Sequence, residues 1–252
     1  MVENTEIRSV ILAAGKGTRM KSEHPKVATL LNGKPLIRHV LDNLYSAGIK
    51  STYVVVGYKK EIVIDLCKDY PNIRFVEQKE QLGTGHAVLC AESELSNFKG
   101  SLLVACGDVP LITPKSFLSL IQFHLMNSNK VTVLSCEVSE PKGYGRLIRD
   151  KSQNLLEIVE EKDASEIQRL VKEINTGTYM FQSPEVFTDL KNVNKENAQG
   201  EYYLPDLVKI ANAKGEKTGA IKLLNHLESS GVNSPEDLAR LESFILEGKV
   251  AI

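Results

Sequence analysis

An apolar run leads directly into a cationic glycine turn in the stretch Val10-Ile11-Leu12-Ala13-Ala14-Gly15-Lys16-Gly17-Thr18-Arg19-Met20. Its first three residues are typical of a buried strand. The two glycines allow a tight turn and a close approach of the backbone to a ligand. Four cations fall within eleven positions, at Lys16, Arg19, Lys21 and Lys26. Because polyphosphates bind open backbone N–H groups beside fixed positive charge, the stretch predicts a phosphate-binding loop after a strand.

The spacing of this loop differs from both common phosphate motifs. A P-loop needs a glycine five positions before its Gly-Lys pair, and no glycine stands at that distance from Gly15 or Gly17. The dinucleotide fingerprint needs a third small residue where Met20 stands. The loop is therefore expected to bind phosphate in another geometry.

Strand and helix patterns alternate along most of the chain. Short runs rich in β-branched residues predict strands at 10–12, 52–56, 73–76, 102–105, 131–136, 155–160 and 174–181. Helical patterns lie at 35–47, 61–69, 86–94, 114–126, 165–172, 203–213 and 235–247. Ser234, Pro235 and Asp237 form a helix start. The alternation predicts an α/β, Rossmann-like fold: a mixed, mostly parallel sheet flanked by helices. Such sheets bind ligands beyond the carboxyl ends of their strands.

Composition limits the classes of partner. The net charge of the 252 residues is −1, so no long-range field attracts nucleic acid or a membrane surface. Residues 1–6 lack the features of a secretory signal, and no stretch reaches the ~18 apolar residues of a membrane span. The four cysteines have no C-x-x-C spacing and stand in apolar runs, which favours buried, reduced thiols. We expect a cytoplasmic protein without nucleic-acid or membrane partners.

A carboxylate follows another predicted strand in Gly107-Asp108-Val109-Pro110. Mg²⁺ takes few protein ligands and completes its octahedron with phosphate oxygens and water, so Asp108 beside a phosphate loop suits this ion. An ordinary turn aspartate before proline is the alternative. Asn233, just before the last predicted helix, is a candidate second ligand, although a turn asparagine explains its position as well.

Further candidates stand beside glycines or interrupt apolar strands. Gln78 precedes the loop Gly83-Thr84-Gly85, where exposed N–H groups could recognise a base or phosphate; an ordinary loop into a helix is the alternative. Gly145, Glu160 and Asn175 are polar or flexible positions near predicted strands, and sugar hydroxyls or structural hydrogen bonds would equally satisfy them. The five histidines show no metal or nucleophile spacing, so surface or helix-cap positions are expected.

A general base is not required if the nucleophile is a sugar phosphate. Its second pKa is ~6, so it is already ionised at neutral pH. Its attack requires positioning and charge neutralisation rather than proton abstraction.

A set of segments resembles one enzyme family over nearly the whole chain. In order they are Leu12–Met20 with Pro25-Lys26, Gln81–Ala87, Gly107–Leu111, Gly143–Arg146, Glu173–Gly177, Asn197–Tyr203 and Gly231–Asn233. Together they resemble the N-terminal uridyltransferase domain of bacterial N-acetylglucosamine-1-phosphate uridyltransferase/glucosamine-1-phosphate acetyltransferases. The first segment alone indicates only the wider sugar-nucleotidyltransferase superfamily. Gln81–Ala87 and Asn197–Tyr203 are much more specific.

The resemblance implies a nucleotidyltransferase fold and a Mg²⁺-dependent reaction. UTP and N-acetylglucosamine 1-phosphate would give pyrophosphate and UDP-N-acetylglucosamine, a peptidoglycan precursor. The implied roles are uridine binding by Leu12, Ala13, Ala14, Gly15, Gln78, Gly83 and Thr84; catalysis by Arg19 and Lys26; Mg²⁺ binding by Asp108 and Asn233; and N-acetylglucosamine binding by Gly145, Glu160 and Asn175. One domain is expected over 1–252, with a nucleotide side (about 1–112), a sugar side (about 113–230) and a closing helix (about 234–248).

Three departures from the family pattern leave alternatives open. Cys106 stands where an aromatic residue is usual, and Pro205 where threonine is common. The 252 residues contain no hexapeptide repeats, so the acetyltransferase β-helix is not expected here, and neither is the trimer that it forms. The first alternative function is a nucleotidyltransferase for another sugar 1-phosphate, such as glucose 1-phosphate. The second is a non-catalytic UDP-sugar-binding regulator.

Overall fold

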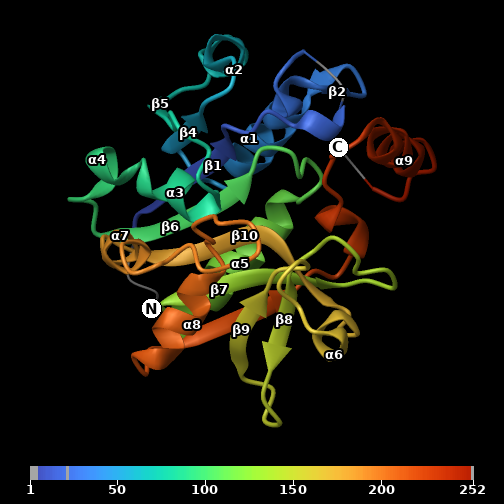
Figure 1. Cartoon of the computed structure of the whole chain (residues 1–252). Helices are drawn as coiled ribbons and strands as arrows, with labels where there is room; N and C mark the ends of the chain where they lie inside the picture. Colours follow the sequence, from blue (N-terminus) through green and yellow to red (C-terminus); the bar gives the residue numbers. More distant parts are fainter. Residues whose placement is uncertain (1–4, 21–22, 251–252) are drawn as a thin grey trace.

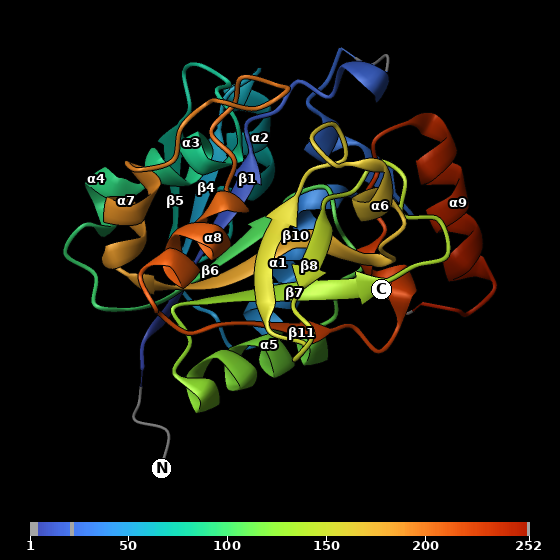
Figure 2. The ribbon, with the colours of Figure 1, turned by 60° about the horizontal axis from the view of Figure 1, so that its bottom comes forward.

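A nine-stranded sheet forms the centre of the computed structural model, which describes residues 5–20 and 23–250. Seven strands follow one another in the order β11-β7-β10-β6-β1-β4-β5 (Figures 1 and 2). Their bounds are β1 (Ile7–Ala13), β4 (Thr52–Val56), β5 (Ile73–Glu77), β6 (Gly100–Cys106), β7 (Val131–Glu137), β10 (Glu173–Ser183) and β11 (Thr218–Lys222). Along this path, β10 is antiparallel to both of its neighbours and the remaining pairs are parallel. The predicted α/β fold with a mixed, mostly parallel sheet is confirmed.

Two hairpins complete the strands. β8 (Arg146–Arg149) and β9 (Leu155–Val159) pair antiparallel, and β8 joins the main sheet where Arg146 pairs with Ile174 of β10. β2 (Leu30–Leu31) and β3 (Lys34–Pro35) form a small separate sheet.

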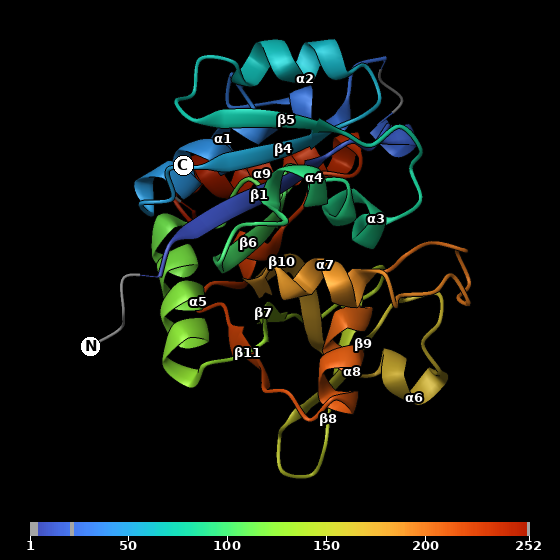
Figure 3. The same ribbon diagram turned by 90° about the vertical axis from the view of Figure 1, so that its left-hand side faces the viewer.

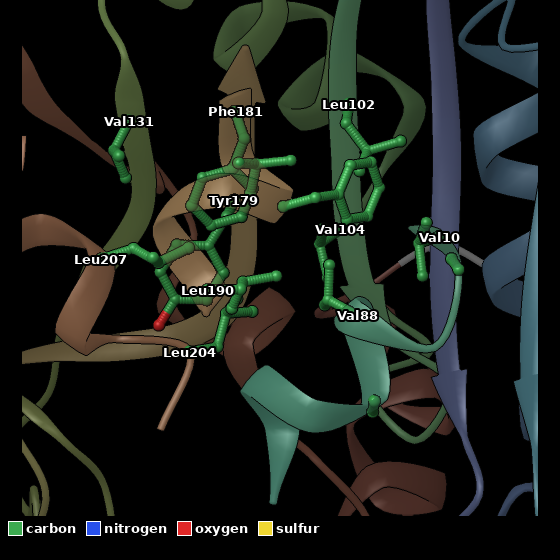
Figure 4. Packing of buried hydrophobic residues seen from close by; sticks show 14 of the residues in the cluster. Val10, Val88, Leu102, Val104, Val131, Tyr179, Phe181, Leu190, Leu204 and Leu207 are labelled. Atoms are coloured by element: carbon green, nitrogen blue, oxygen red, sulfur yellow. The ribbon is translucent and has the colours of Figure 1, made fainter. Parts of the chain in front are cut away.

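Side chains of the main sheet alternate between two faces, and each face has its own helices. On one face, Val10, Val104 and Tyr179 pack against α3 (Thr84–Leu89), α4 (Glu92–Leu95), α7 (Glu185–Leu190) and α8 (Asp206–Ala213), as Figure 4 shows in part. On the other, Ile11 and Leu103 pack against α1 (Leu36–Ser46), α2 (Lys60–Cys67) and α5 (Pro114–Asn127). Figure 3 shows α5 and α8 on opposite sides of β7 and β10. Because both faces of the sheet are buried, the sequences of its strands are continuous apolar runs.

The last helix packs outside the two main clusters. α9 (Pro235–Leu246) places Leu241 against Leu31 and Leu36 from the β2–β3 region, together with Val232. It begins at the predicted helix start, which the structure shows to be a capping box: the Ser234 hydroxyl accepts from the N–H of Asp237, and the Asp237 carboxylate accepts from the N–H of Ser234. The C-terminal segment therefore returns to the end of the sheet that carries the predicted phosphate loop, where Met20 joins the same cluster.

Several predicted elements differ in detail. The predicted 86–94 helix is two short helices, α3 and α4, with a turn at Cys90–Ala91 between them. The predicted 165–172 helix is only α6 (Glu166–Arg169), because the carbonyl of Lys172 already accepts from the N–H of Val138 beside the sheet. β8, β11 and α7 were not predicted. No helix in the described part of the chain is long and apolar enough to cross a membrane.

Candidate active site

The side chain of Lys26 packs against Gly17 in the glycine turn after β1. Gly17 has φ +64°, and a Cβ placed there would lie 2.6 Å from the Cβ of Lys26. A larger residue at this position would therefore strain the backbone and displace the lysine. No atom lies within 4 Å of a Cβ placed on Gly15, so this glycine faces open space. Lys21, another cation of the sequence motif, lies outside the described residues.

A cavity of about 280 Å³ lies beyond the carboxyl ends of β1, β5 and β6. It is lined by all of the residues predicted to hold the nucleotide: Leu12, Ala13, Ala14, Gly15, Gln78, Gly83 and Thr84. Lys26, Cys106 and Asp108 line the same cavity. The turn at Asp108 is tied to β1 because the N–H of Gly107 donates to the carbonyl of Leu12 at 3.0 Å. Parallel strands thus bring together residues nearly a hundred positions apart.

The amide of Gln78 is held in one orientation. Its Nε2 donates to the carbonyl oxygen of Gly83 at 3.1 Å and lies 3.0 Å from Nδ1 of His86. A carbonyl only accepts, so the nitrogen must face Gly83, and Oε1 is left as the acceptor that the side chain can offer a ligand. Gln78 is 4% exposed, which restricts its movement.

Two motifs far apart in sequence pack together behind this amide. The N–H of Gly85 donates to the carbonyl of Tyr202, and the N–H of Tyr202 donates to the carbonyl of Leu82, both at 2.8 Å. A Cβ on Gly83 would lie 2.7 Å from that Tyr202 oxygen, so only glycine fits there. The hydroxyl of Thr84 accepts from the N–H of Leu204 at 3.1 Å. Segments 81–87 and 197–203 therefore form one wall.

Lys26, Asp108 and Asn233 meet at the phosphate-loop end. Lys26 Nζ forms an ion pair with Asp108 and donates to Asn233 Oδ1 at 3.0 Å. Arg19 Nη2 donates to the same Asn233 oxygen at 3.2 Å. The side chains of Lys26 and Asp108 are only 18% and 16% exposed. The oxygens of Asp108 and Asn233, one of them charged, thus converge on the ammonium group of Lys26. Oxygen donors of this kind are the ones that Mg²⁺ prefers.

The loops that carry Asp108 and Asn233 are fastened to each other. The N–H of Val232 donates to the carbonyl of Asp108 at 3.0 Å. Glu228, which is 6% exposed, accepts from the N–H and hydroxyl of Thr113 and from the hydroxyl of Ser116 at 2.6–3.0 Å. Its carboxylate therefore caps the start of α5, where negative charge is favourable. Sequence reasoning missed Glu228, which lies in the short helix His226–Ser229.

The predicted sugar residues meet at an irregularity of β10. The register of β10 against β7 shifts between Asn175 and Thr178, and Gly177 has φ +79°. The N–H of Asn175 donates to the carbonyl of Gly145 at 2.9 Å. A Cβ on Gly145 would lie 2.9 Å from Glu160 Oε1, so the absence of a side chain admits the carboxyl group. The bulge and the β8–β9 hairpin thus place the three residues together.

Glu160 is in a negatively charged environment with little solvent. Burial raises the pKa of Glu160 to about 7, and the nearby carboxylates of Asp163 and Asp206 act in the same direction. Burial also raises the pKa of Asp206 to about 6. These groups line a second cavity of about 360 Å³. At neutral pH a carboxyl with such a pKa is partly protonated, so it can donate as well as accept a hydrogen bond.

Cys106 lies between the two groups of residues. Its Sγ lies 2.8 Å from a Cβ placed on Gly177 and donates to the Gly177 carbonyl at 3.6 Å. Burial raises the pKa of the Cys106 thiol to about 12, so the group stays neutral. All four cysteines are free thiols, and Cys67 and Cys136 are buried.

The expectation that the histidines lie at the surface or at helix caps was wrong for two of them. His39 and His124 are 5% and 1% exposed because their rings pack in the interior and bond to Leu31 and Thr132. His86 has a role that the sequence analysis missed, since it contacts the Gln78 amide. Its place in segment 81–87, directly after the glycines, was the available signal.

Comparison with known proteins connects this arrangement to one family. Residues 8–226 match the family described as nucleotidyl transferase. "Bifunctional protein GlmU" of Streptococcus sanguinis is 47% identical over 93% of this chain and 51% of its own length. The protein of the same name from Streptococcus agalactiae serotype V is 47% identical over 93% of this chain and 50% of its own. The chain spans about half the length of these curated relatives.

A solved structure shares the fold. The crystal structure of UDP-glucose pyrophosphorylase complexed with UDP-glucose superposes with a TM-score of 0.76, covering 96% of this chain and 98% of that one. The two sequences are 19% identical, so the likeness concerns the fold alone.

Proposed function

The chain belongs to the nucleotidyl transferase family, and we propose that it transfers UMP from UTP to N-acetylglucosamine 1-phosphate. The products would be UDP-N-acetylglucosamine and pyrophosphate. The observation that carries this proposal is that the amide of Gln78, the ammonium of Lys26 and the carboxylate of Asp108 line the same cavity. The relatives that match over most of this chain support it.

Uracil is selected by a fixed acceptor. Because Gln78 Nε2 is engaged by Gly83 and His86, the side chain offers Oε1 to the ligand. This oxygen can accept from N3–H of uracil, whereas N3 of cytosine carries no hydrogen. The wall formed by 81–87 and 197–203 limits the space for a second ring. The nearby backbone of Leu12, Ala13, Ala14 and Gly15 would hold the nucleoside.

Charge neutralisation accounts for catalysis. The ionised sugar phosphate attacks the α-phosphorus in line, and negative charge builds on the α-phosphoryl and leaving oxygens. Lys26 would stabilise the α-phosphoryl group and Arg19 the outer phosphates. Asp108 and Asn233 would hold Mg²⁺, which supplies further positive charge to the phosphate oxygens when bound. In the described residues no group of three or more His, Cys, Asp or Glu converges as a metal site, consistent with an ion held mainly by phosphate and water.

The sugar would bind between Gly145, Glu160 and Asn175. Glu160 can bond hydroxyl or amide groups in either protonation state, and Asn175 holds the bulge through its bond from the N–H of Gly177 at 2.9 Å. We also propose that the nucleotide and sugar sides act as one domain closed by α9. The continuous sheet from β5 to β11 supports this.

Pyrophosphate release tests the proposal. Purified protein with Mg²⁺ is given UTP, CTP, GTP or ATP, each with N-acetylglucosamine 1-phosphate or glucose 1-phosphate. We expect turnover chiefly with UTP and N-acetylglucosamine 1-phosphate, and its loss in Asp108→Asn. Faster turnover with glucose 1-phosphate would instead establish the first alternative function. UDP-sugar binding without any pyrophosphate release would establish a regulator.

A further inference from the structure

The position between Asp108 and Asn233 is taken by a side chain of the protein itself. Lys26 Nζ pairs with the Asp108 carboxylate and donates to Asn233 Oδ1 at 3.0 Å. Arg19 Nη2 donates to the same oxygen at 3.2 Å. A carbonyl-type oxygen has two lone pairs, so both acceptor positions of Asn233 Oδ1 are engaged. A divalent ion that uses this oxygen must first displace a cationic side chain.

The lysine is the partner that can move. The backbone of Asn233 is fixed, because its N–H donates to Asp237 at 3.0 Å and Val232 bonds to the Asp108 carbonyl. Lys26 reaches the position on a flexible stem of four carbons, whose first part packs over Gly17. An ammonium and a divalent ion on the same carboxylate would repel each other, so only one of them can occupy the position at a time.

We propose that Lys26 is a built-in competitor of the divalent cation, which neutralises Asp108 in the ligand-free protein and leaves when nucleotide phosphates bind. This rests on the proposed function, because the phosphates are the partners to which Lys26 moves. Asp108 is largely shielded from water, so a carboxylate without a nearby cation would be costly there. The lysine removes that cost until substrate arrives. By reciprocity, nucleotide then promotes metal binding, and metal promotes nucleotide binding.

The test measures Mn²⁺ binding without nucleotide, from the electron paramagnetic resonance signal of the free ion. Lys26→Met keeps an apolar stem over Gly17 and removes the charge. We expect it to bind Mn²⁺ about tenfold more tightly than the unaltered protein, equivalent to ~1.4 kcal/mol. Lys16→Met removes one exposed positive charge from the same loop without touching Asp108, and should change the affinity by no more than about threefold.

Asp108→Asn tests whether the tighter Mn²⁺ binding of Lys26→Met depends on Asp108. In the double variant Lys26→Met/Asp108→Asn the tighter binding should disappear, because the two residues are coupled. Lys26→Gln provides a second neutral variant, and circular dichroism checks that each protein is folded. Equal Mn²⁺ affinity in the unaltered protein and both neutral variants would overturn the proposal, as would a gain that survives Asp108→Asn. Because the assay contains no UTP and no sugar phosphate, its outcome does not depend on which reaction the enzyme performs.

Discussion

The proposed nucleotide side and the proposed sugar side position their polar residues in different ways. On the nucleotide side, Gly15, Gln78 and Asp108 follow the ends of parallel strands that meet at one edge of the sheet. On the sugar side, Asn175 lies within the antiparallel strand β10 at a bulge, and Gly145 and Glu160 flank a hairpin. Parallel strands deliver their ends to a common edge by topology alone. A bulge and a hairpin depend on the particular pairing of strands.

The two sides also differ in how charge is compensated. Lys26 and Arg19 face Asp108 and Asn233, so the phosphate end holds cations and their partners together. At the sugar end, Glu160 lies near further carboxylates and its pKa is raised to about 7. The phosphate end should therefore control the rate of the chemical step, and the sugar end should control pH response and recognition.

Removing Lys26, the cation proposed to act in catalysis, should have the largest effect. Lys26→Ala should lower kcat by roughly 10²-fold or more, because the charge acts on the transition state. The affinity for uridine nucleotides should fall much less, as measured by calorimetric titration. A normal kcat with only a raised KM for UTP would make Lys26 a binding residue. It would contradict the view that the phosphate end controls the rate of the chemical step.

Removing Gln78, the proposed acceptor for uracil, should have an intermediate effect on the same side. Gln78→Ala should lower kcat/KM for UTP by up to about tenfold, the contribution of one hydrogen bond of ordinary strength. The ratio of kcat/KM for UTP to that for CTP should fall as well. Gln81→Ala is the matched control, because Gln81 is another glutamine that lines the cavity. Its Nε2 donates to the backbone carbonyl of Gln78 at 3.4 Å, so its amide has a different partner from that of Gln78. An unchanged UTP/CTP ratio in Gln78→Ala would contradict base selection by this residue.

Loosening the join between the Asp108 and Asn233 loops should raise the Mg²⁺ requirement. Glu228→Gln weakens three hydrogen bonds at the start of α5, so the two loops should hold the ion less well. We expect about fivefold more Mg²⁺ for half-maximal rate, less than the ~10–100-fold typical of groups that bond directly to a metal ligand, because Glu228 bonds to Thr113 and Ser116 instead. Asp189→Asn is the control, because Asp189 is a buried carboxylate that pairs with Lys214 just after α8. Its replacement should lower the stability of the protein and leave the Mg²⁺ requirement unchanged. Equal Mg²⁺ requirements in both variants would reduce Glu228 to a stabilising residue.

The smallest expected effect concerns Glu160 and pH. Its folded-state pKa of about 7 lies above the ordinary 4.5, so between these values the folded protein holds a proton that the unfolded chain has released. The stability of the unaltered protein therefore falls as pH rises through this interval and stays lower above it. Glu160→Gln lacks this loss, so its Tm at pH 8 relative to pH 5 should be higher by several degrees, because each ~1 kcal/mol corresponds to about 2–4 °C in a chain of this size. Parallel Tm profiles would show that Glu160 is not buried as described.

The same contrast separates what could be predicted from what could not. The strand before Gly15, the turn at Asp108 and the capping box at Ser234 follow from local patterns, and the structure contains each of them. β8 and β11 were missed because their short, partly buried sequences carry little periodic signal. Two residues with supporting contacts, His86 and Glu228, were missed because their partners, Gln78 and Thr113, are specified only by folding.

The sequence by itself determined the alternating α/β pattern, the cationic glycine turn and the family to which the chain belongs. These depend on local propensity and on the order of motifs, which a linear chain already contains. The tertiary structure decided that Lys26 lies on Asp108 and Asn233, that the amide of Gln78 faces Gly83, and that the carboxyl of Glu160 fits against Gly145. Electrostatic and hydrogen-bond energies depend on distance and on exclusion of water, and the folded chain alone sets both for residues up to 214 positions apart.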